Sequence, residues 1–226
     1  SKINYIIMKN FKLLSIFLKK FTHKKISYSY GGMDSLIEKI FKNKINGIYV
    51  DIGCGHPIKN NNTYLLNKKG WSGVNIDLDK ENIELFNLYR PRDHNVSAAI
   101  SNNKKEVDLF FYHSKSALNT INKDTADYQK ALVSKVKKIK TTTLNNVLDY
   151  SRFKDFTIDF LTIDVEGSEL LVLENFNFSK YKPKIIVVEY LDLSLNKLEI
   201  KNLNINSAIK SSIYKLIISH NYTLVN

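Results

Sequence analysis

The sequence lacks the features of a disulfide scaffold and of a membrane-spanning protein. It holds one cysteine, Cys54, in 226 residues, so an internal disulfide is excluded. No uninterrupted apolar run reaches the about 18 residues that a spanning helix requires. The three prolines are scattered, and no repeat or low-complexity tract interrupts the chain. These absences favour a folded protein of a reducing compartment, and we expect a cytoplasmic location.

Arginine is also scarce, because 31 of the 34 basic residues are lysine. Arginine is the residue that binds phosphate groups and guanine edges with two hydrogen bonds. The lysines leave a formal net charge of +12, which is more often a solvated surface than a recognition site. We therefore predict no specific nucleic-acid partner. A non-catalytic basic module that binds a membrane or nucleic acid is kept as the alternative function.

Apolar residues make up 43% of the chain, enough for a large core, and from residue 47 onward they form short runs. Strands are predicted at 48–52, 73–77, 96–100, 160–165 and 185–190, with crossover helices at 63–69, 80–89 and 168–175. This alternation predicts an α/β fold, a Rossmann-like doubly wound and mostly parallel sheet. An added strand at 107–112, a substrate-facing loop at 113–127 and a last strand at 222–225 complete the prediction.

The N-terminal segment has a different pattern. Apolar residues at alternating spacings of four and three, between lysines, predict a basic amphipathic helix over 3–21. We therefore divide the chain into this helical segment, 1–27, and a main domain, 28–226. The apolar face has two open interpretations: it packs on the domain or on a second copy in a homo-oligomer, or it lies on an anionic membrane surface as a peripheral contact.

A nucleoside site is predicted where the first strand ends. Asp51, Gly53 and Gly55 form an Asp-x-Gly-x-Gly turn, whose glycines let the backbone bend and let a ligand approach. Asp77 follows at the end of the second strand, 22 residues after Gly55, where a carboxylate can accept ribose hydroxyls.

The kind of nucleoside follows from what the turn omits. A dinucleotide site needs a third glycine, where this chain has Ile58, and there is no phosphate-binding Gly-x-x-x-x-Gly-Lys loop. S-adenosylmethionine carries no phosphates and suits the site, with Asn62 and Thr63 placed to donate to its carboxylate. An oxidoreductase that binds a nicotinamide cofactor is kept as a rival.

Acidic residues follow the fourth and fifth strands. Asp164 and Glu166 come directly after the strand at 160–165, and Glu189 ends the next one. Ligands of doubly wound sheets bind at this edge, so we expect the acids in the site. Glu169 has two interpretations, as a cap of the following helix or as part of the site.

Together these motifs resemble the FkbM family of S-adenosylmethionine-dependent methyltransferases over residues 28–226. The matching segments are 49–55, 62–64, 70–77, 97–101, 163–167 and Lys182-Pro183 leading to Glu189. The resemblance implies a class I methyltransferase fold and methylation of a hydroxyl on a sugar, polysaccharide precursor or related small molecule. The cofactor positions are Asp51, Gly53, Cys54, Gly55, Asn62, Thr63, Asp77, Ser97 and Ala98.

Catalysis of such a transfer needs a base near the acceptor hydroxyl. Asp164 or Glu166 is the predicted base, Glu189 would orient the acceptor, and His113 in the loop is a second candidate base. The three acids could instead hold a divalent cation, but their spacing in the sequence is not distinctive, so we predict no metal.

Overall fold

A computed structural model describes residues 27–42, 44–114, 116–129, 133–194 and 205–225. The amphipathic helix predicted over 3–21 lies outside these ranges. The described part contains no helix long and apolar enough to cross a membrane.

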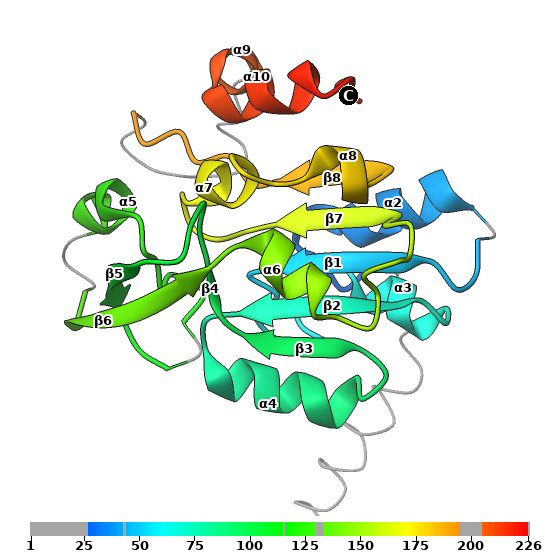
Figure 1. Cartoon of the computed structure of the whole chain (residues 1–226), viewed down its shortest axis with the longest axis horizontal. Helices are drawn as coiled ribbons and strands as arrows, with labels where there is room; N and C mark the ends of the chain where they lie inside the picture. The colour runs from blue at the N-terminus through cyan, green and yellow to red at the C-terminus, as the bar shows by residue number, and fades with distance from the viewer. Residues whose placement is uncertain (1–26, 43, 115, 130–132, 195–204, 226) are drawn as a thin grey trace, which may run out of the picture.

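Five parallel strands form the central sheet, in the order β3-β2-β1-β7-β8 (Figure 1). They are β1 (Ile48–Ile52), β2 (Ser72–Asp77), β3 (His94–Ser97), β7 (Phe160–Ile163) and β8 (Ile185–Val188). The order reverses between β1 and β7, which are direct neighbours in the sheet. The predicted Rossmann-like, doubly wound sheet is therefore confirmed, and its carboxyl edge at this reversal is where such sheets bind ligands.

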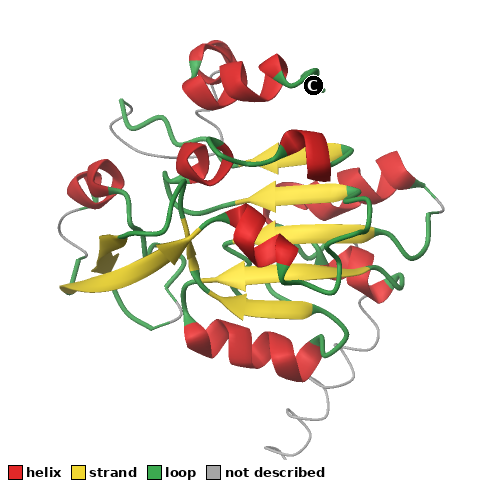
Figure 2. Ribbon diagram, viewed as in Figure 1, coloured by secondary structure: helices red, strands yellow, loops and turns green. Residues whose placement is uncertain are grey.

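Both faces of the sheet are covered by helices (Figure 2). On one face, Ile48, Val50 and Ile52 of β1 pack on α6 (Leu144–Asp149), α7 (Glu169–Leu173) and α8 (Phe178–Tyr181). Tyr49, which points the opposite way in the same strand, packs on α2 (Met33–Phe41) and α3 (Tyr64–Lys68). The helix α4 (Lys80–Tyr89) contacts β2 and β3, and a short 3-10 turn, η1 (Tyr30–Gly32), precedes α2. The near-continuous apolar strands reflect this burial on two sides.

A second, smaller sheet extends beyond the carboxyl edge of the first (Figure 1). It comprises β4 (Ala99–Ile100), β6 (Lys135–Thr142) and β5 (Glu106–Phe111), in that order, with α5 (Lys123–Tyr128) between β5 and β6 in the chain. The strand predicted at 96–100 is thus divided, because β3 pairs with β2 whereas β4 pairs with β6. The prediction also missed β6, whose lysines are mostly exposed.

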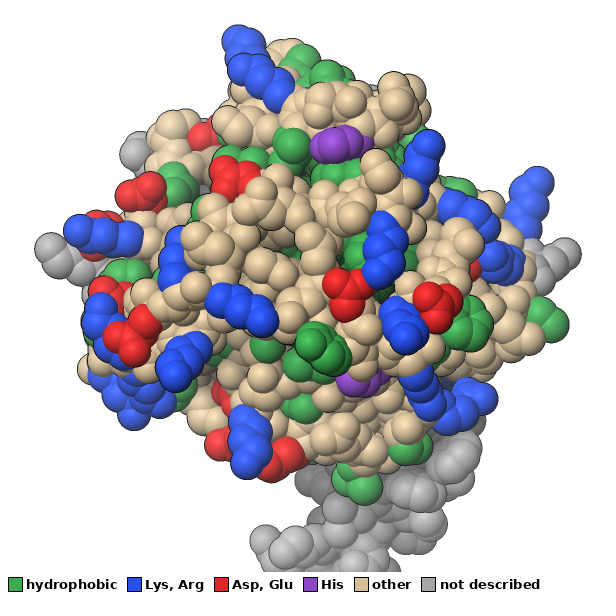
Figure 3. Space-filling model, viewed as in Figure 1, with side chains coloured by type: hydrophobic (Ala, Val, Ile, Leu, Met, Phe, Trp, Pro, Cys, Tyr) green, Lys and Arg blue, Asp and Glu red, His purple; other side chains and the backbone are tan. Residues whose placement is uncertain are grey.

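The predicted last strand at 222–225 does not form. The chain after β8 continues, within the described residues, into α9 (Ile205–Lys210) and α10 (Ser212–Ser219). Tyr222 is then held by its side chain, since its hydroxyl donates to the Pro183 carbonyl at 2.7 Å and its ring contacts Phe178. On the visible face basic side chains are scattered and mixed with acidic ones (Figure 3), as the solvated-surface interpretation expects.

Candidate active site

A cavity of about 700 Å³ opens at the carboxyl edge of the central sheet. Its walls come from the segments that follow β1, β2, β3, β5, β7 and β8. Among the lining residues are Gly53, Cys54, Gly55, Asp77, Leu78, Ala98, Ile100, Ser116, Leu118, Asn119, Ile121, Asp164, Glu166, Ser168 and Glu189. The volume suits a ligand of drug size or larger. The glycine turn and the acidic residues therefore share one cavity.

The turn after β1 requires its two glycines for different reasons. Gly53 has φ +76°, and a Cβ there would lie 1.6 Å from the carbonyl oxygen of Asp164. Any side chain would thus separate β1 from β7. Gly55 has φ +57° with open space where its Cβ would stand, so the backbone is bare toward the cavity. A ligand can approach the main chain at this point.

Asp77 ties this turn to the end of β2. Its carboxylate accepts from the backbone N–H of Gly55 at 2.8 Å and from that of Asp79 at 2.7 Å. Burial raises its pKa to about 6, because the charged form loses water. A carboxylate has about four acceptor positions, and the Asn82 side chain takes a third, so one remains for a ligand hydroxyl. Leu78 and Ala98 add an apolar wall beside it, which fits a nucleoside.

Four of the predicted cofactor residues do not line this cavity. Asp51 and Thr63 are buried behind the turn, where the Thr63 hydroxyl donates to Asp51 at 2.7 Å. Asn62 donates instead to the hydroxyl of Thr162 at 3.0 Å. Ser97 is exposed at the end of β3, and its neighbour Ala98 is the one that lines the cavity. The cavity walls therefore contain five of the nine predicted cofactor residues.

Sequence reasoning missed Arg90, which supports the turn from behind. The guanidinium is buried and donates to Thr63 at 2.8 Å, to Asn61 at 2.6 Å and to the Pro57 carbonyl. Burial raises the pKa of Asp51 to about 6, although the hydrogen bond from Thr63 and the charge of Arg90 both lower it. A buried aspartate implies a counter-charge, but no spacing along the chain indicates that Arg90 supplies it.

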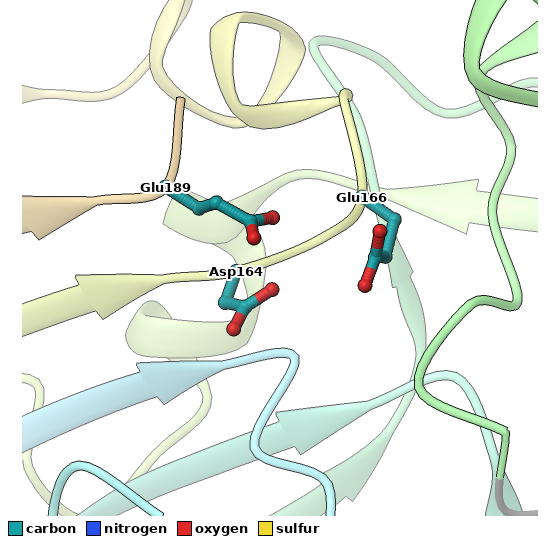
Figure 4. A group of neighbouring side chains, drawn as sticks. All are labelled: Asp164, Glu166 and Glu189. Carbon is teal, nitrogen blue, oxygen red and sulfur yellow. The ribbon is translucent and has the colours of Figure 1, made fainter. Parts of the chain in front are cut away.

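Three carboxyl groups meet at the other end of the cavity. Asp164 and Glu189 follow the neighbouring strands β7 and β8, and Glu166 lies farther along the loop toward α7 (Figure 4). Oxygens of the three groups all lie within 4.8 Å of one another. The sequence placed these acids at one edge, and the structure brings their side chains together.

The acidic cluster cannot hold three negative charges cheaply. Burial, and then the charges of Asp164 and Glu169, raise the pKa of Glu166 to about 8. Burial and the neighbouring Asp164 and Glu166 raise the pKa of Glu189 far above its usual range. The raised pKa favours the protonated form of Glu189, which is hydrogen-bonded to Asp164. A divalent cation is the other way to neutralise such a cluster, so a proton and a cation are the two alternatives for this site.

Two further candidate residues, Glu169 and His113, lie outside the cluster of three carboxyl groups. Glu169 is buried, and its carboxylate accepts from the N–H groups of Val165 and Gly167 at 3.0 and 3.1 Å. It therefore shapes the loop that carries Glu166. His113 is exposed and does not line the cavity. Its ring nitrogen Nδ1 is hydrogen-bonded to the Ser114 carbonyl at 2.8 Å. A histidine in an exposed loop has no fixed geometry toward an acceptor.

Stability is expected to fall as Glu166 ionises. Its folded pKa of about 8 lies above the unfolded value, so the folded state binds more protons between about pH 4.5 and 8. The contribution of Glu166 to the free energy of unfolding is complete below pH 4.5 and is lost as pH rises through 8. We expect Glu166→Gln to raise the melting temperature at pH 9 by about 2–4 °C per kcal/mol of relieved penalty, and by a much smaller amount at pH 5, where little of the penalty has developed.

Calorimetric melting of the ligand-free protein at both pH values measures this difference. The exposed Glu84 of α4 supplies the matched control, Glu84→Gln, which should melt as the wild type does. An equal gain in melting temperature at pH 5 and pH 9 would contradict the prediction, because it would show that ionising Glu166 does not destabilise the folded state.

A family comparison covers this whole arrangement. The family model described as the methyltransferase FkbM domain matches residues 51–211. The chain belongs to the FkbM methyltransferase family. This FkbM match begins at Asp51 in β1 and extends past Glu189, so it includes both the glycine turn and the acidic cluster. The resemblance seen in the sequence is confirmed, and the protein is a methyltransferase. No curated protein and no solved structure was found to match the chain.

Proposed function

We propose that this FkbM methyltransferase transfers a methyl group from S-adenosylmethionine to a hydroxyl of a sugar, polysaccharide precursor or related small molecule. One observation carries the proposal: a single cavity joins the bare glycine turn and Asp77 to three carboxyl groups. The first end suits a nucleoside, and the second can activate and orient a hydroxyl.

The cofactor end is formed by the segments after β1, β2 and β3. Asp77 would accept a ribose hydroxyl, Gly53 and Gly55 would let the ligand lie against the main chain, and Ala98 would border the adenine. Cys54 is buried beside them as a free thiol, whose pKa burial raises, so it is an inert wall residue. S-adenosylmethionine supplies an electrophilic methyl group on a sulfonium when bound.

The acceptor end is formed by the acidic cluster. A general base works best when its pKa lies near the working pH, and Glu166 meets that condition with a pKa of about 8. We assign Glu166 as the base that removes the acceptor's proton and keep Asp164 as the second candidate. Glu189 is hydrogen-bonded to Asp164, and its other carboxyl oxygen, buried without a hydrogen-bond partner, can accept from the acceptor hydroxyl and orient it.

Methyl transfer is expected to continue without a divalent cation. In this proposal Glu166 removes the proton, so no metal is needed to polarise the hydroxyl. Protein dialysed against EDTA should keep its turnover within about twofold. The comparison is the same protein with magnesium or manganese restored. A loss that added metal reverses would instead assign the acidic cluster to a cation.

Two measurements test the proposed function. Calorimetric titration with S-adenosylhomocysteine should show micromolar binding, and a panel of simple sugars should support its release from S-adenosylmethionine. No binding to a folded sample would contradict the proposal. In that case the basic-module alternative predicts binding to anionic vesicles or nucleic acid with a steep salt dependence, and a nicotinamide titration tests the oxidoreductase rival.

A further inference from the structure

We infer that Thr120 and Asn122 are positioning residues that hold Glu166 in a strained backbone conformation facing the acceptor. The inference rests on the proposed function, because it gives Glu166 a role in the transfer. It concerns two side chains that do not themselves line the cavity.

The strain is located at Glu166 and the residue after it. Glu166 has φ +55°, a left-handed value that side chains other than glycine seldom adopt, and Gly167 has φ +93°. Such a conformation persists only where surrounding contacts determine it, and it tends to occur at functional sites. The contacts that could determine it are the hydrogen bonds to this peptide segment.

The two carbonyl oxygens of the strained segment are held from one side. The Thr120 hydroxyl donates to the carbonyl of Glu166 at 2.8 Å, and the Asn122 amide donates to the carbonyl of Gly167 at 2.5 Å. From the α7 side, Glu169 accepts the N–H of Gly167. The loop is therefore held on both sides, and each side uses polar side chains.

Thr120 is itself rigidly placed. It is fully buried, and its backbone exchanges two hydrogen bonds with Phe110 of β5, at 2.8 and 3.2 Å. Its hydroxyl oxygen accepts from the N–H of Asn122 at 2.9 Å, which leaves the hydroxyl proton for Glu166. Asn122 in turn caps α5 by accepting from the N–H of Thr125 at 2.9 Å. The support of Glu166 thus extends to β5 and α5.

The same segment also forms a wall of the cavity. Ser116, Leu118 and Ile121 line it on either side of Thr120 in the sequence. One short stretch therefore borders the acceptor space and fixes the base. If either donor is lost, the Glu166 backbone can relax toward an ordinary φ and its carboxyl moves. A displacement of about 1 Å can cost about 10²-fold in rate, whereas the cofactor end is untouched.

The test compares substitutions that differ by one hydrogen bond. Thr120→Val removes the hydroxyl while keeping the shape, and it should lower kcat about 10- to 100-fold with S-adenosylhomocysteine affinity unchanged. Thr120→Ser keeps the hydroxyl and should restore kcat to within about threefold. Thr143→Val is the matched control, because the Thr143 hydroxyl accepts one hydrogen bond of its own, from the N–H of Asn146 in α6, and does not line the cavity. It should leave kcat unchanged.

Asn122→Asp provides a second variant, because the carboxylate keeps the cap on Thr125 and loses the donor to Gly167. Hydrogen exchange of the peptide that contains Glu166 is measured in parallel and should accelerate in Thr120→Val and Asn122→Asp only. The inference is wrong if these variants bind S-adenosylhomocysteine and turn over at the wild-type rate, or if Thr143→Val lowers kcat as much as they do. If the wild type transfers no methyl group to any sugar, the proposed function fails, while the exchange data still report on whether the two residues hold the loop.

Discussion

Glu166→Gln is expected to lower kcat by about 10²- to 10⁴-fold, the usual contribution of a positioned general base. Glutamine keeps the size of the side chain but cannot take the proton of the acceptor hydroxyl. Because burial and the neighbouring acids raise the pKa of Glu166 to about 8, the wild-type rate should rise with pH up to that value. The variant should lose that rise. Initial rates of S-adenosylhomocysteine release between pH 6 and 9 measure both effects.

Two neighbours of Glu166 serve as internal controls. Glu189→Gln exchanges a protonated carboxyl for an amide that can still donate, so its effect should stay below about tenfold. Asp164→Asn separates the two candidate bases. If kcat falls strongly in Asp164→Asn while Glu166→Gln keeps full activity, Asp164 is the general base. If Asp164→Asn mainly weakens S-adenosylhomocysteine binding, Asp164 belongs to the cofactor end. That outcome agrees with the position of Asp164, whose backbone carbonyl lies against Gly53 of the glycine turn.

Asp77→Ala is expected to weaken S-adenosylhomocysteine binding by about 10²-fold or more. The alanine removes the acceptor for a ribose hydroxyl, and a hydrogen bond to a charged group contributes about 1.5–3 kcal/mol. It also frees the N–H groups of Gly55 and Asp79, so the glycine turn loses its tie to β2. Calorimetric titration of folded protein gives the affinity directly.

The control for this change is Asp79→Ala, which removes an acid two residues away that does not line the cavity. It should keep the affinity within about threefold, because the Asp79 side chain caps α4 through Glu81 instead. Melting temperatures of both variants show whether the fold is kept. Wild-type affinity in a folded Asp77→Ala protein would place the nucleoside elsewhere in the cavity.

Strand positions were predictable wherever the pattern was local. β1 and α4 have the predicted bounds, because a short apolar run between polar turns and a capped amphipathic segment are each complete in the sequence. β6 was missed, since its exposed lysines give no apolar run and its register depends on β4 and β5. The expected strand at 222–225 failed for a related reason. A strand needs a partner edge, and Tyr222 is held by side-chain contacts instead.

The site was predictable to the extent that strand ends determine it. Asp164 and Glu189 directly follow the adjacent parallel strands β7 and β8, whose carboxyl ends meet at one edge, and Glu166 comes two residues after Asp164. Asp51 was assigned to the cofactor because it precedes the glycine turn, but it lies inside β1 and faces the buried Thr63 and Arg90. Position near a motif does not reveal which way a side chain points.

The sequence by itself determined the parallel α/β sheet, the family and the two ends of the cavity. Each of these depends on consecutive residues or on residues that follow the carboxyl ends of neighbouring strands. The tertiary structure alone decided the network around Arg90, the raised pKa of Glu166 and the support from Thr120. These depend on burial and on hydrogen bonds between residues distant in the chain. The physical reason is that such contacts form when whole elements pack, and no local pattern records them.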